Sequence, residues 1–407
     1  MLGANERSGA LGKQVLAILP SLGLGGGIER YWNWLRGVAE EGGATVDEQA
    51  LLGPGDHPSL QRKVRFAARI FSAAHRSRRL ESVEVLVAHP NLATMAWLAC
   101  RCAALRPETF AVAYYGSDIR GLGPLQRWVA SRLPIQPITI SSFSAGTLSP
   151  IGPPMIVPPG IAADWYELLT APPHTDNRPG GREATDPGEH TNTVQVLTVF
   201  RLSESWGKGL PQIVGALDQV RDRTGIDIHL TVAGSGTLPD DTRALISTRD
   251  WITVVSGLSD EHLATLYHRA DIFVLATRTT FRPPYSGEGF GIVLIEAQLA
   301  GTPVVAPAHG GSDDAFLDGI TGVKPVDESA EALADAIEPL ISDPELRHTL
   351  GANARAWSRA TFEPRRRNAH VRHLLGWDRN GSDRTAPGIN DLGLSLTPRP
   401  EQFPDPG

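Results

Sequence analysis

The sequence predicts an α/β protein with two doubly wound, parallel-sheet domains facing a central cleft, and three observations lead to this prediction. Apolar runs of strand length alternate with segments of helical periodicity in both halves of the 407-residue chain. Several apolar runs lead into glycine-bearing loops that open helices, as at residues 21–30 and 288–291. Between the halves, residues 171–193 are rich in Pro, Gly, Asp and Thr and show no periodicity, which is typical of a linker.

The composition argues against several classes of protein. Hydrophobic residues make up 41% of the chain and charged residues 20%, as expected of globular domains, and the net charge of −7 argues against nucleic acid as a partner. No run of 18 uncharged apolar residues predicts a membrane span. Cys100 and Cys102 lie two positions apart in a helix-like stretch and would point in different directions. We therefore expect no disulfide and a reducing, cytoplasmic location.

The first half opens with an apolar strand at residues 15–19, a glycine-rich loop at 21–30 and a helix that continues to about residue 40. Ile28 stands where the dinucleotide pattern G-x-G-x-x-G needs its last glycine, so a nicotinamide cofactor is not expected. Gly26 and Gly27 have two interpretations. They let a ligand approach the backbone, or they form a tight turn that lets the helix pack on the sheet.

Residues 61–79 are expected to form an amphipathic helix whose apolar side consists of Val64, Ala67, Ala68 and Phe71. The segment carries seven positive charges and no acid, namely Arg62, Lys63, Arg65, Arg69, Arg76, Arg78 and Arg79. Two interpretations remain open. The helix contacts an anionic membrane surface or a phosphorylated acceptor, or its charges only solvate the surface, which is the commoner use of a charge run.

Two further strands of the first half end in polar residues. The strand at 83–88 is followed by His89, and the strand at 110–114 is followed by Tyr115 and Asp118. Because ligands in open α/β sheets collect beyond the carboxyl ends of strands, all three residues are candidates to face a cleft. His89 could equally well cap a strand without contacting a ligand. Segments at 138–141 and 155–160 are expected to end this domain.

The second half repeats the alternation, with strands at 194–200, 228–233, 252–254 and 272–276 and helices at 210–223 and 260–269. The first of these strands delivers Arg201 and Lys208 on a loop that leads into a helix. Two cations at the carboxyl end of a strand suit a diphosphate. Helices are expected at 334–341, 345–360 and 362–375, and the proline-rich residues 378–407 are expected to be disordered.

Residues 288–297 are the most informative stretch, because they connect two apolar strands through a glycine loop and a helix. The helix is expected to place Gly289 and Glu296 on one face, with Glu288 at its entrance. A helix N-terminus offers N–H groups and the positive end of a dipole to a phosphate or a sugar oxygen. Glu288 and Glu296 fit such a site if they accept hydrogen bonds from the hydroxyl pairs of a sugar.

Several common chemistries have no motif in this chain. The phosphate loop G-x-x-x-x-G-K-[ST], the metal motifs H-E-x-x-H, C-x-x-C and D-x-D, and the nucleophile elbow G-x-S-x-G are all absent. We therefore expect neither a bound metal nor another cofactor.

Taken together, these residues resemble glycosyltransferase family 4, whose members are retaining, metal-independent transferases with the GT-B fold. The resemblance is sparse in the first half, where it rests on Gly26-Gly27-Ile28-Glu29-Arg30, and dense from residue 257 to residue 326. In the second half the matching residues are Arg201, Lys208-Gly209, Gly257-Leu258-Ser259-Asp260-Glu261, Ala270-Asp271, Glu288-Gly289-Phe290-Gly291, Glu296-Ala297, Gly301-Thr302-Pro303-Val304-Val305 and Gly310-Gly311.

The resemblance implies two Rossmann-like domains. Residues 1–185, with the linker at 171–193, would bind an acceptor, and residues 194–360 would bind a UDP- or GDP-sugar donor. Residues 361–377 would form a helix that packs back on the first domain. The implied reaction is a hexosyl transfer, with retention of configuration, to a hydroxyl of a polysaccharide, a lipid-linked intermediate or a small natural product.

The resemblance also implies roles for single residues. Glu288 would hold hydroxyls of the donor sugar near the reacting carbon, and Glu296 would bind the ribose of the nucleotide. Arg201 and Lys208 would stabilise the diphosphate as a leaving group. The remaining donor contacts would come from Gly289, from the backbone N–H groups of Phe290, Gly291 and Ile292, from Gly257 and Leu258, and, across the cleft, from Gly26 and Gly27.

Three departures from the family pattern bear on the reaction. Many relatives carry a histidine where Tyr115 stands, and a tyrosine is a poor base near neutral pH. Asp118 or His89 would then take part in catalysis, or the departing phosphate would deprotonate the acceptor. Phe200 stands where a glycine is common in the family, and the segment at 278–287 is longer than usual. Both lie beside the expected donor site.

Three functions fit these residues. The first is a retaining glycosyltransferase, which the acidic pair and the two cations favour. The second is a related GT-B enzyme, such as a sugar-nucleotide epimerase or a phosphorylase, although no lysine lies in a context that suggests a pyridoxal site. The third is a non-catalytic sugar-nucleotide-binding subunit, which the departure at Tyr115 suggests. The sequence does not distinguish a uridine donor from a guanosine donor, and it does not identify the acceptor.

Overall fold

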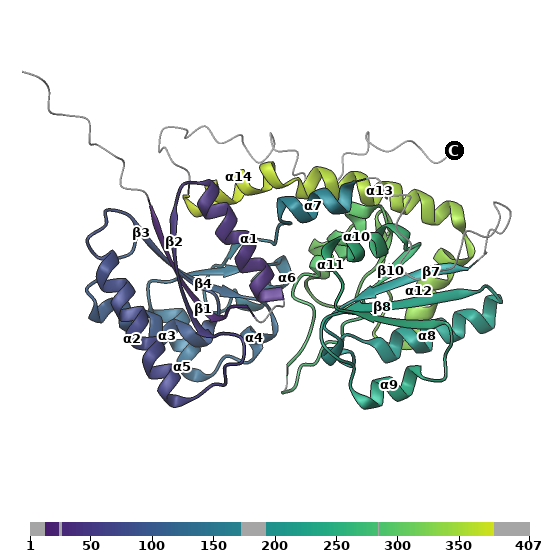
Figure 1. Ribbon diagram of the computed structural model, residues 1–407, viewed down its shortest axis with the longest axis horizontal. Coiled ribbons are helices and arrows are strands. Elements are labelled where there is room, and N and C mark those ends of the chain that lie inside the picture. Colours follow the sequence, from purple (N-terminus) through teal and green to yellow (C-terminus); the bar gives the residue numbers. More distant parts are fainter. Residues whose placement is uncertain (1–12, 24–26, 172–192, 284, 378–407) are drawn as a thin grey trace, which may run out of the picture.

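The computed structural model describes residues 13–23, 27–171, 193–283 and 285–377 and contains two parallel, six-stranded sheets with helices packed on their faces (Figure 1). This arrangement confirms the predicted pair of doubly wound domains. Most of the expected linker at 171–193 and the whole expected tail at 378–407 lie outside the described residues. None of the helices in the described part of the chain combines the length and the apolar character that crossing a membrane requires.

The first sheet has the strand order β2-β1-β3-β4-β5-β6, and all its neighbouring strands are parallel. Its strands are β1 (Gln14–Ser21), β2 (Thr45–Leu52), β3 (Val83–Val87), β4 (Thr109–Tyr114), β5 (Gln136–Thr139) and β6 (Met155–Ile156). Alternate residues of β1 point to opposite faces, so Val15 and Ala17 enter one core and Leu16 and Ile18 enter another. Both faces of the sheet are therefore covered by helices, as in other parallel sheets.

Helices α1 (Gly27–Glu41) and α14 (Pro364–Leu375) pack on one face of this sheet, together with Trp377. The opposite face is covered by α2 (Leu60–Ser77) and α3 (Pro90–Cys102), with α5 (Pro124–Arg132) packed beside α3. Two short helices, α4 (Ser117–Arg120) and α6 (Ser142–Leu148), lie toward the second domain (Figure 1). On α3, Cys100 is buried and Cys102 is exposed, and both are free thiols as expected.

The second sheet has the order β12-β11-β10-β7-β8-β9 and is also parallel. Its strands are β7 (Val194–Val199), β8 (Ile228–Gly234), β9 (Ile252–Ser256), β10 (Ile272–Val274), β11 (Val304–Val305) and β12 (Gly322–Val323). Helices α8 (Leu210–Thr224), α9 (Asp240–Ile246) and α12 (Ala330–Ser342) lie on one face. Helices α7 (Ala163–Thr170), α10 (Asp260–Arg269), α11 (Ile292–Ala300) and α13 (Pro344–Phe362) lie on the other, and the short turns η1 (Leu202–Glu204) and η2 (Gly311–Asp314) follow β7 and β11.

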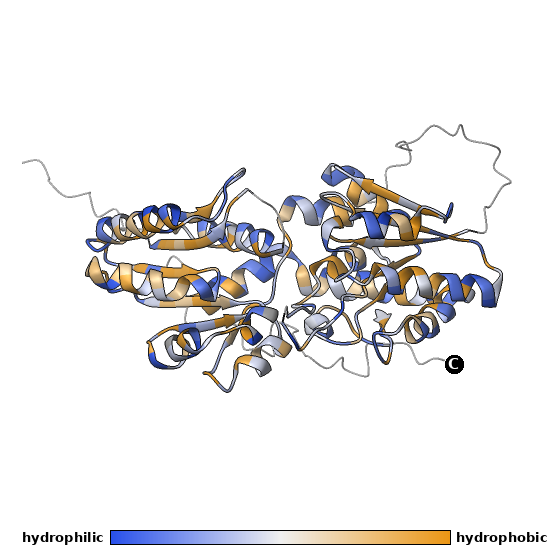
Figure 2. Cartoon of the chain, turned by 90° about the horizontal axis from the view of Figure 1, so that it is seen from below, coloured by the Kyte–Doolittle hydropathy of each residue, from blue (hydrophilic) through white to orange (hydrophobic). Residues whose placement is uncertain are grey.

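The chain crosses between the domains twice. Helix α7 precedes the linker in the sequence, yet it packs on α10 and α11 of the second domain. Helices α13 and α14 run along one side of the molecule over both domains (Figure 1), and α14 packs against α1. One continuous cluster of buried apolar residues therefore spans both domains. The strands carry the hydrophobic colours inside both halves of the molecule, while hydrophilic colours are common on the outer helices (Figure 2).

The apolar side predicted for the helix at 61–79 is wrong. In α2 the buried residues include Phe66, Ile70 and Ala73, whereas Val64 is 62% exposed and Phe71 is 41% exposed. The helix carries two apolar stripes, and the sheet takes the one that fits Leu16 and Ile18. The basic residues are also less free than the helix alone suggests, because β2 and the loop that follows supply acids. Arg62 pairs with Asp56 at 2.5 Å, and Arg76 pairs with Asp47 at 3.1 Å.

Asn368 fastens α14 to the first domain. Its side chain is 6% exposed, accepts a hydrogen bond from Trp34 Nε1 at 3.0 Å, and donates to Glu41 at 3.0 and 3.1 Å. We expect Asn368→Ala to lower the free energy of unfolding by about 2 kcal/mol, because it leaves the buried indole N–H without an acceptor. Urea unfolding measures this loss.

The matched control is Arg365→Ala, one turn earlier on the exposed side of α14. We expect it to change the same free energy by less than about 0.5 kcal/mol. Equal losses in the two variants would show that the Asn368 contacts do not fasten the helix.

Candidate active site

The two domains meet where the carboxyl ends of their sheets face each other. The loop between β10 and α11 lies against the end of β4, and Gly289 makes the closest contact. A Cβ atom at Gly289 would stand 2.3 Å from the carbonyl oxygen of Tyr115 and 3.1 Å from Ile140 Cδ1. Only glycine allows this approach of the two backbones. On the same side, Ser142 donates both its N–H and its hydroxyl to Asp314, at 2.5 and 2.6 Å.

Glu288 lies at this junction, and residues of its own domain hold its side chain. Its side chain is 12% exposed, and Oε2 accepts hydrogen bonds from Lys208 Nζ at 3.1 Å and from Thr277 Oγ1 at 2.7 Å. Burial alone would raise the pKa of Glu288, but the charge of Lys208 and the hydrogen bonds from Thr277, Lys208 and the Phe290 N–H lower it below its ordinary value. Glu288 is therefore an anion with a fixed orientation.

Helix α11 begins at Ile292, after the expected start near Gly289, so Glu288 and Gly289 belong to the preceding loop and share no helical face with Glu296. The N-cap residue, Gly291, adopts φ 88°, a left-handed conformation that favours glycine. No side chain of the described residues caps this end of the helix. The positive end of α11 is thus open to an anion, although the Phe290 N–H is already bonded to Glu288.

Glu296 is buried, and both of its carboxylate oxygens accept hydrogen bonds. It is 1% exposed, its Oε1 accepts from Arg30 Nη1 and Trp165 Nε1, both at 3.0 Å, and its Oε2 accepts from Tyr267 at 2.7 Å. Arg30 belongs to α1 of the first domain, and its side chain is 51% exposed. Contact between Glu296 and a ribose requires Arg30 to leave Oε1, because both carboxylate oxygens are occupied in this arrangement. The ribose role stays a prediction.

The other expected donor residues lie on the second domain at the same edge of its sheet. Arg201 follows β7, is 43% exposed, and pairs with Glu204 at 2.8 Å. Gly257, at φ 68°, and Leu258 follow β9. Gly27 opens α1 and has open space around it, whereas Gly26 lies outside the described residues. Arg201 and Lys208 share one loop, as the sequence indicated.

His89 and Asp118 are neighbours across the ends of β3 and β4. Burial lowers the pKa of His89 and raises the pKa of Asp118, and each of the two charges partly offsets the shift of the other. Each also has a local structural partner. His89 Nδ1 accepts from Asn91 N at 3.2 Å, and Asp118 Oδ1 accepts from the N–H groups of Tyr115 and Gly116, at 3.0 and 2.7 Å.

Tyr115 does not offer its hydroxyl to an acceptor, which corrects its placement among the acceptor-side candidates. Its ring lies edge-on to Tyr31, with 5.9 Å between centroids, and its hydroxyl is buried without a hydrogen-bond partner among the described residues. Burial raises the pKa of Tyr115 well above its ordinary value. The part of Tyr115 that faces Gly289 at the junction is its backbone carbonyl oxygen.

Several residues of the site escaped sequence reasoning. Thr277 holds Glu288, while Trp165 and Tyr267 hold Glu296. None of the three stands within a recognisable motif, so the sequence offered no signal for them. Arg30 ends the glycine motif of the first domain and was noted only as part of that resemblance.

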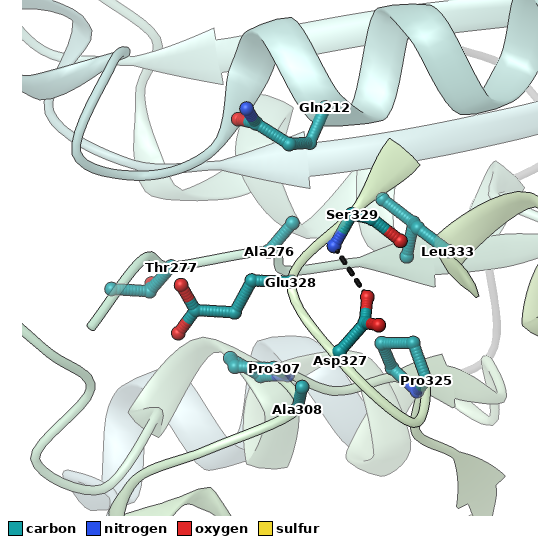
Figure 3. Close-up of a pocket in the computed structure, with 10 residues that line it drawn as sticks. All are labelled: Gln212, Ala276, Thr277, Pro307, Ala308, Pro325, Asp327, Glu328, Ser329 and Leu333. Carbon is teal, nitrogen blue, oxygen red and sulfur yellow. Dashed lines mark hydrogen bonds between the residues drawn. The ribbon is translucent and has the colours of Figure 1, made fainter. Parts of the chain in front are cut away.

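A cavity beneath Glu288 is too small for a substrate. It has a volume of about 10 Å³ and lies between α8, the end of β10 and the residues before α12 (Figure 3). Gln212, Thr277 and Glu328 point toward it, and Asp327 accepts a hydrogen bond from Ser329 N at its edge. A space of this size holds about one water molecule.

Solved structures define the class of fold. The chain aligns with sucrose-phosphate synthase from Thermosynechococcus elongatus at a TM-score of 0.66 and 20% identity, covering 89% of this chain and 98% of that one. It aligns with Anabaena HepE, solved in complex with UDP-glucose, at a TM-score of 0.64 and 16% identity, covering 89% and 99%. These similarities show the GT-B fold.

Residues 182–357 match the family model of glycosyl transferases group 1. Curated relatives include the GDP-mannose-dependent α-(1-6)-phosphatidylinositol monomannoside mannosyltransferase of Mycolicibacterium smegmatis, at 29% identity over 54% of this chain and 55% of that protein. Another is the D-inositol 3-phosphate glycosyltransferase of Pseudarthrobacter chlorophenolicus, at 32% identity over 54% and 52%. The chain spans about half the length of these curated relatives.

Removing Lys208 tests the electrostatics of Glu288. In the folded chain the lowered pKa of Glu288 stabilises the protein above its ordinary value of 4.5, and this contribution is lost as the pH falls through the folded pKa. In Lys208→Met the charge of Lys208 no longer offsets the effect of burial, so the pKa of Glu288 rises. We expect the variant to lose about 3 kcal/mol of unfolding free energy at pH 7, and this loss should shrink as the pH falls through the raised pKa of Glu288 in the variant.

Urea unfolding across this pH range measures the loss. The matched control is Lys324→Met, whose partner Asp313 is 58% exposed, and we expect it to cost less than about 1 kcal/mol at any pH. A loss in Lys208→Met that is independent of pH would contradict the electrostatic explanation.

Proposed function

We propose that this protein is a retaining glycosyltransferase that moves a sugar from a nucleoside diphosphate to an acceptor hydroxyl. The observation that carries the proposal is the Lys208–Glu288 pair beside the open N-terminus of α11, on a loop whose Gly289 packs against the carbonyl oxygen of Tyr115 in the first domain. A fixed anion accepts hydrogen bonds from the hydroxyls of a neutral sugar. A cation and an uncapped helix N-terminus attract a charged diphosphate. The match of residues 182–357 to the family model of glycosyl transferases group 1 supports this reaction type.

The donor binds on the second domain. Glu288 accepts hydrogen bonds from hydroxyls of the sugar, and Lys208 and Arg201 take the diphosphate between them and the end of α11. Their charges stabilise the diphosphate as it leaves, which lowers the barrier without a metal ion. Binding of the ribose by Glu296 follows if Arg30 moves off Oε1.

The acceptor approaches from the first domain. Tyr115 supplies no base, because its hydroxyl is buried away from the junction. The proton of the attacking hydroxyl passes to the departing phosphate or to the His89–Asp118 pair. Burial favours the neutral forms of both residues of the pair, and His89 accepts a proton only after its Nδ1 gives up the hydrogen bond from Asn91 N.

The alternatives are less well supported. A non-catalytic binding subunit was suggested by Tyr115, yet the Glu288 and Lys208 geometry is complete without its hydroxyl. An epimerase acts on the nucleotide sugar alone, so the His89–Asp118 pair would have no acceptor to act on. Analysis of the product anomer distinguishes retention from these alternatives.

The relatives narrow the substrates to be tried. The M. smegmatis protein is named for GDP-mannose, and HepE was solved with UDP-glucose, so both donor classes are tested first. Both curated relatives are named for an inositol-containing acceptor. A thermal-shift screen of nucleotide sugars identifies the donor, since a ligand that binds the folded state raises its melting temperature.

Glu288 decides between catalysis and binding alone. We expect Glu288→Ala to reduce transfer at least a hundredfold, because the sugar loses its fixed hydrogen-bond acceptor. Turnover of the donor found in the thermal-shift screen, followed with acceptor present, measures the loss. The matched control is Glu328→Ala, an acid beside the neighbouring small cavity, which should retain transfer within a fewfold. Full activity in a folded Glu288→Ala variant would refute the proposed function.

A membrane surface is proposed as the setting of the acceptor. The outer layer of the first domain, formed by α2, α3 and α5, exposes both apolar and basic side chains. The exposed apolar residues are Leu60, Val64, Phe71, Leu98, Leu125 and Trp128, and the exposed basic residues include Lys63, Arg65, Arg101, Arg127 and Arg132. Such a mixture suits the interface of an anionic bilayer.

Sedimentation with vesicles tests this surface. We expect the protein to bind phosphatidylcholine vesicles that contain phosphatidylglycerol, and binding to fall with added salt. Phe71→Glu should weaken binding about tenfold, because it removes an inserted ring and adds a negative charge. The control Val326→Glu changes an 87% exposed apolar residue on the second domain and should bind as the wild type does. Equal binding by both variants would contradict the proposal.

A further inference from the structure

Arg120 has surroundings that the donor site does not explain. It is the last residue of α4, two positions after Asp118, and its guanidinium lies near two aromatic rings. The ring of Phe143, on α6 of the first domain, has its centroid 5.5 Å from Cζ. The ring of Phe281, in the long loop of the second domain, has its centroid 4.5 Å away. Rings of both domains therefore lie within cation–π distance of the cation.

The guanidinium retains hydrogen-bonding capacity. A guanidinium has five N–H donors, and Arg120 makes one long bond, from Nη1 to the carbonyl oxygen of Ser286 at 3.5 Å. Among the described residues it has no ion pair with a carboxylate. Aromatic rings can pack over the faces of a guanidinium but cannot satisfy the donors at its edge. That edge matches the oxygens of a phosphate, which accepts two parallel hydrogen bonds.

Arg120 lies close to the reacting groups. Its Nη1 is 3.9 Å from the position that a Cβ atom of Gly287 would take, and Glu288 is the next residue. Asp118, on the same short helix, forms the pair with His89. An anion held by Arg120 would therefore lie on the first-domain side of the junction, near the hydroxyl that attacks the donor.

The donor diphosphate has cations of its own. Lys208 and Arg201 come from the second domain, and the open end of α11 belongs to that domain as well. Arg120 comes from the opposite domain, after β4. The loop at 278–287 adds Arg282, whereas its Arg278 lies 3.9 Å from Glu328.

We propose that Arg120, near the rings of Phe143 and Phe281, binds a phosphate group carried by the acceptor. This inference rests on the proposed glycosyl transfer and names the chemical class of its acceptor, which is a hydroxyl compound bearing a phosphate ester.

The test is binding of glycerol 3-phosphate, followed by phosphorus NMR, with glycerol as the neutral control. The measurement is made in the presence of whichever nucleotide, UDP or GDP, raises the melting temperature. We expect saturable binding of glycerol 3-phosphate by the wild type and a loss of about tenfold or more in Arg120→Gln. Arg120→Lys, which keeps the charge without the planar fork, should lose less.

Two further variants separate the ring contacts from general charge. Phe281→Leu keeps Arg120 and removes one ring, and binding should weaken only a fewfold. Arg106→Gln removes an exposed arginine at the other end of β4 and should bind as the wild type does. Equal binding by the wild type and a folded Arg120→Gln variant, or no binding by the wild type, would overturn the proposal. Displacement of glycerol 3-phosphate by the nucleotide would also overturn it, because the phosphate would then occupy the donor site.

The same experiment separates this proposal from the proposed function. Failure of every nucleotide sugar to raise the melting temperature counts against glycosyl transfer, whereas intact donor binding with no phosphate site counts against Arg120 alone. Vesicles containing phosphatidylinositol distinguish the source of the phosphate. If they displace glycerol 3-phosphate from the wild type, the acceptor phosphate belongs to a lipid, and if they do not, it belongs to a soluble compound.

Discussion

The close approach of two backbones at Gly289 is the constraint on which the rest of the site depends. A side chain at this position would collide with the carbonyl oxygen of Tyr115, so the junction exists only because a glycine stands there. The approach brings the carboxyl ends of two parallel sheets together. These ends are where α/β proteins gather ligands, and here each sheet contributes its own half of one site. The Ser142–Asp314 hydrogen bonds secure the same contact from the side.

The charges of the site are arranged by domain. The second domain holds Glu288 as an anion by means of Lys208 and Thr277, and it directs the open end of α11 toward the same place. The first domain contributes His89 and Asp118, in which burial opposes charge. In the proposed reaction the second domain would hold the charged leaving group, and the departing phosphate or the His89–Asp118 pair would take the proton.

Glu296 shows how the same motif residue can have a second use. Its carboxylate joins α1, α7, α10 and α11, which belong to both halves of the chain. The pKa of Arg30 is raised chiefly by the charge of Glu296, so Glu296 stabilises the charged form of Arg30. The ion pair thus joins the two domains at the carboxylate that is expected to bind a ribose. Since Arg30 is half exposed, it is the member of this group with room to move.

The sequence by itself determined the two doubly wound domains, the strand ends that carry Arg201, Lys208, His89 and Asp118, and the resemblance to a family. Local periodicity and glycine placement determine these features, and neither depends on distant contacts. The tertiary structure decided what long-range packing decides: which stripe of α2 faces the sheet, that the Tyr115 ring turns toward Tyr31, and that α11 starts after Gly291. It also decided the partners of Glu288 and Glu296 and the ring contacts of Arg120. These contacts join residues far apart in the chain, and no spacing in the sequence encodes which side chains meet.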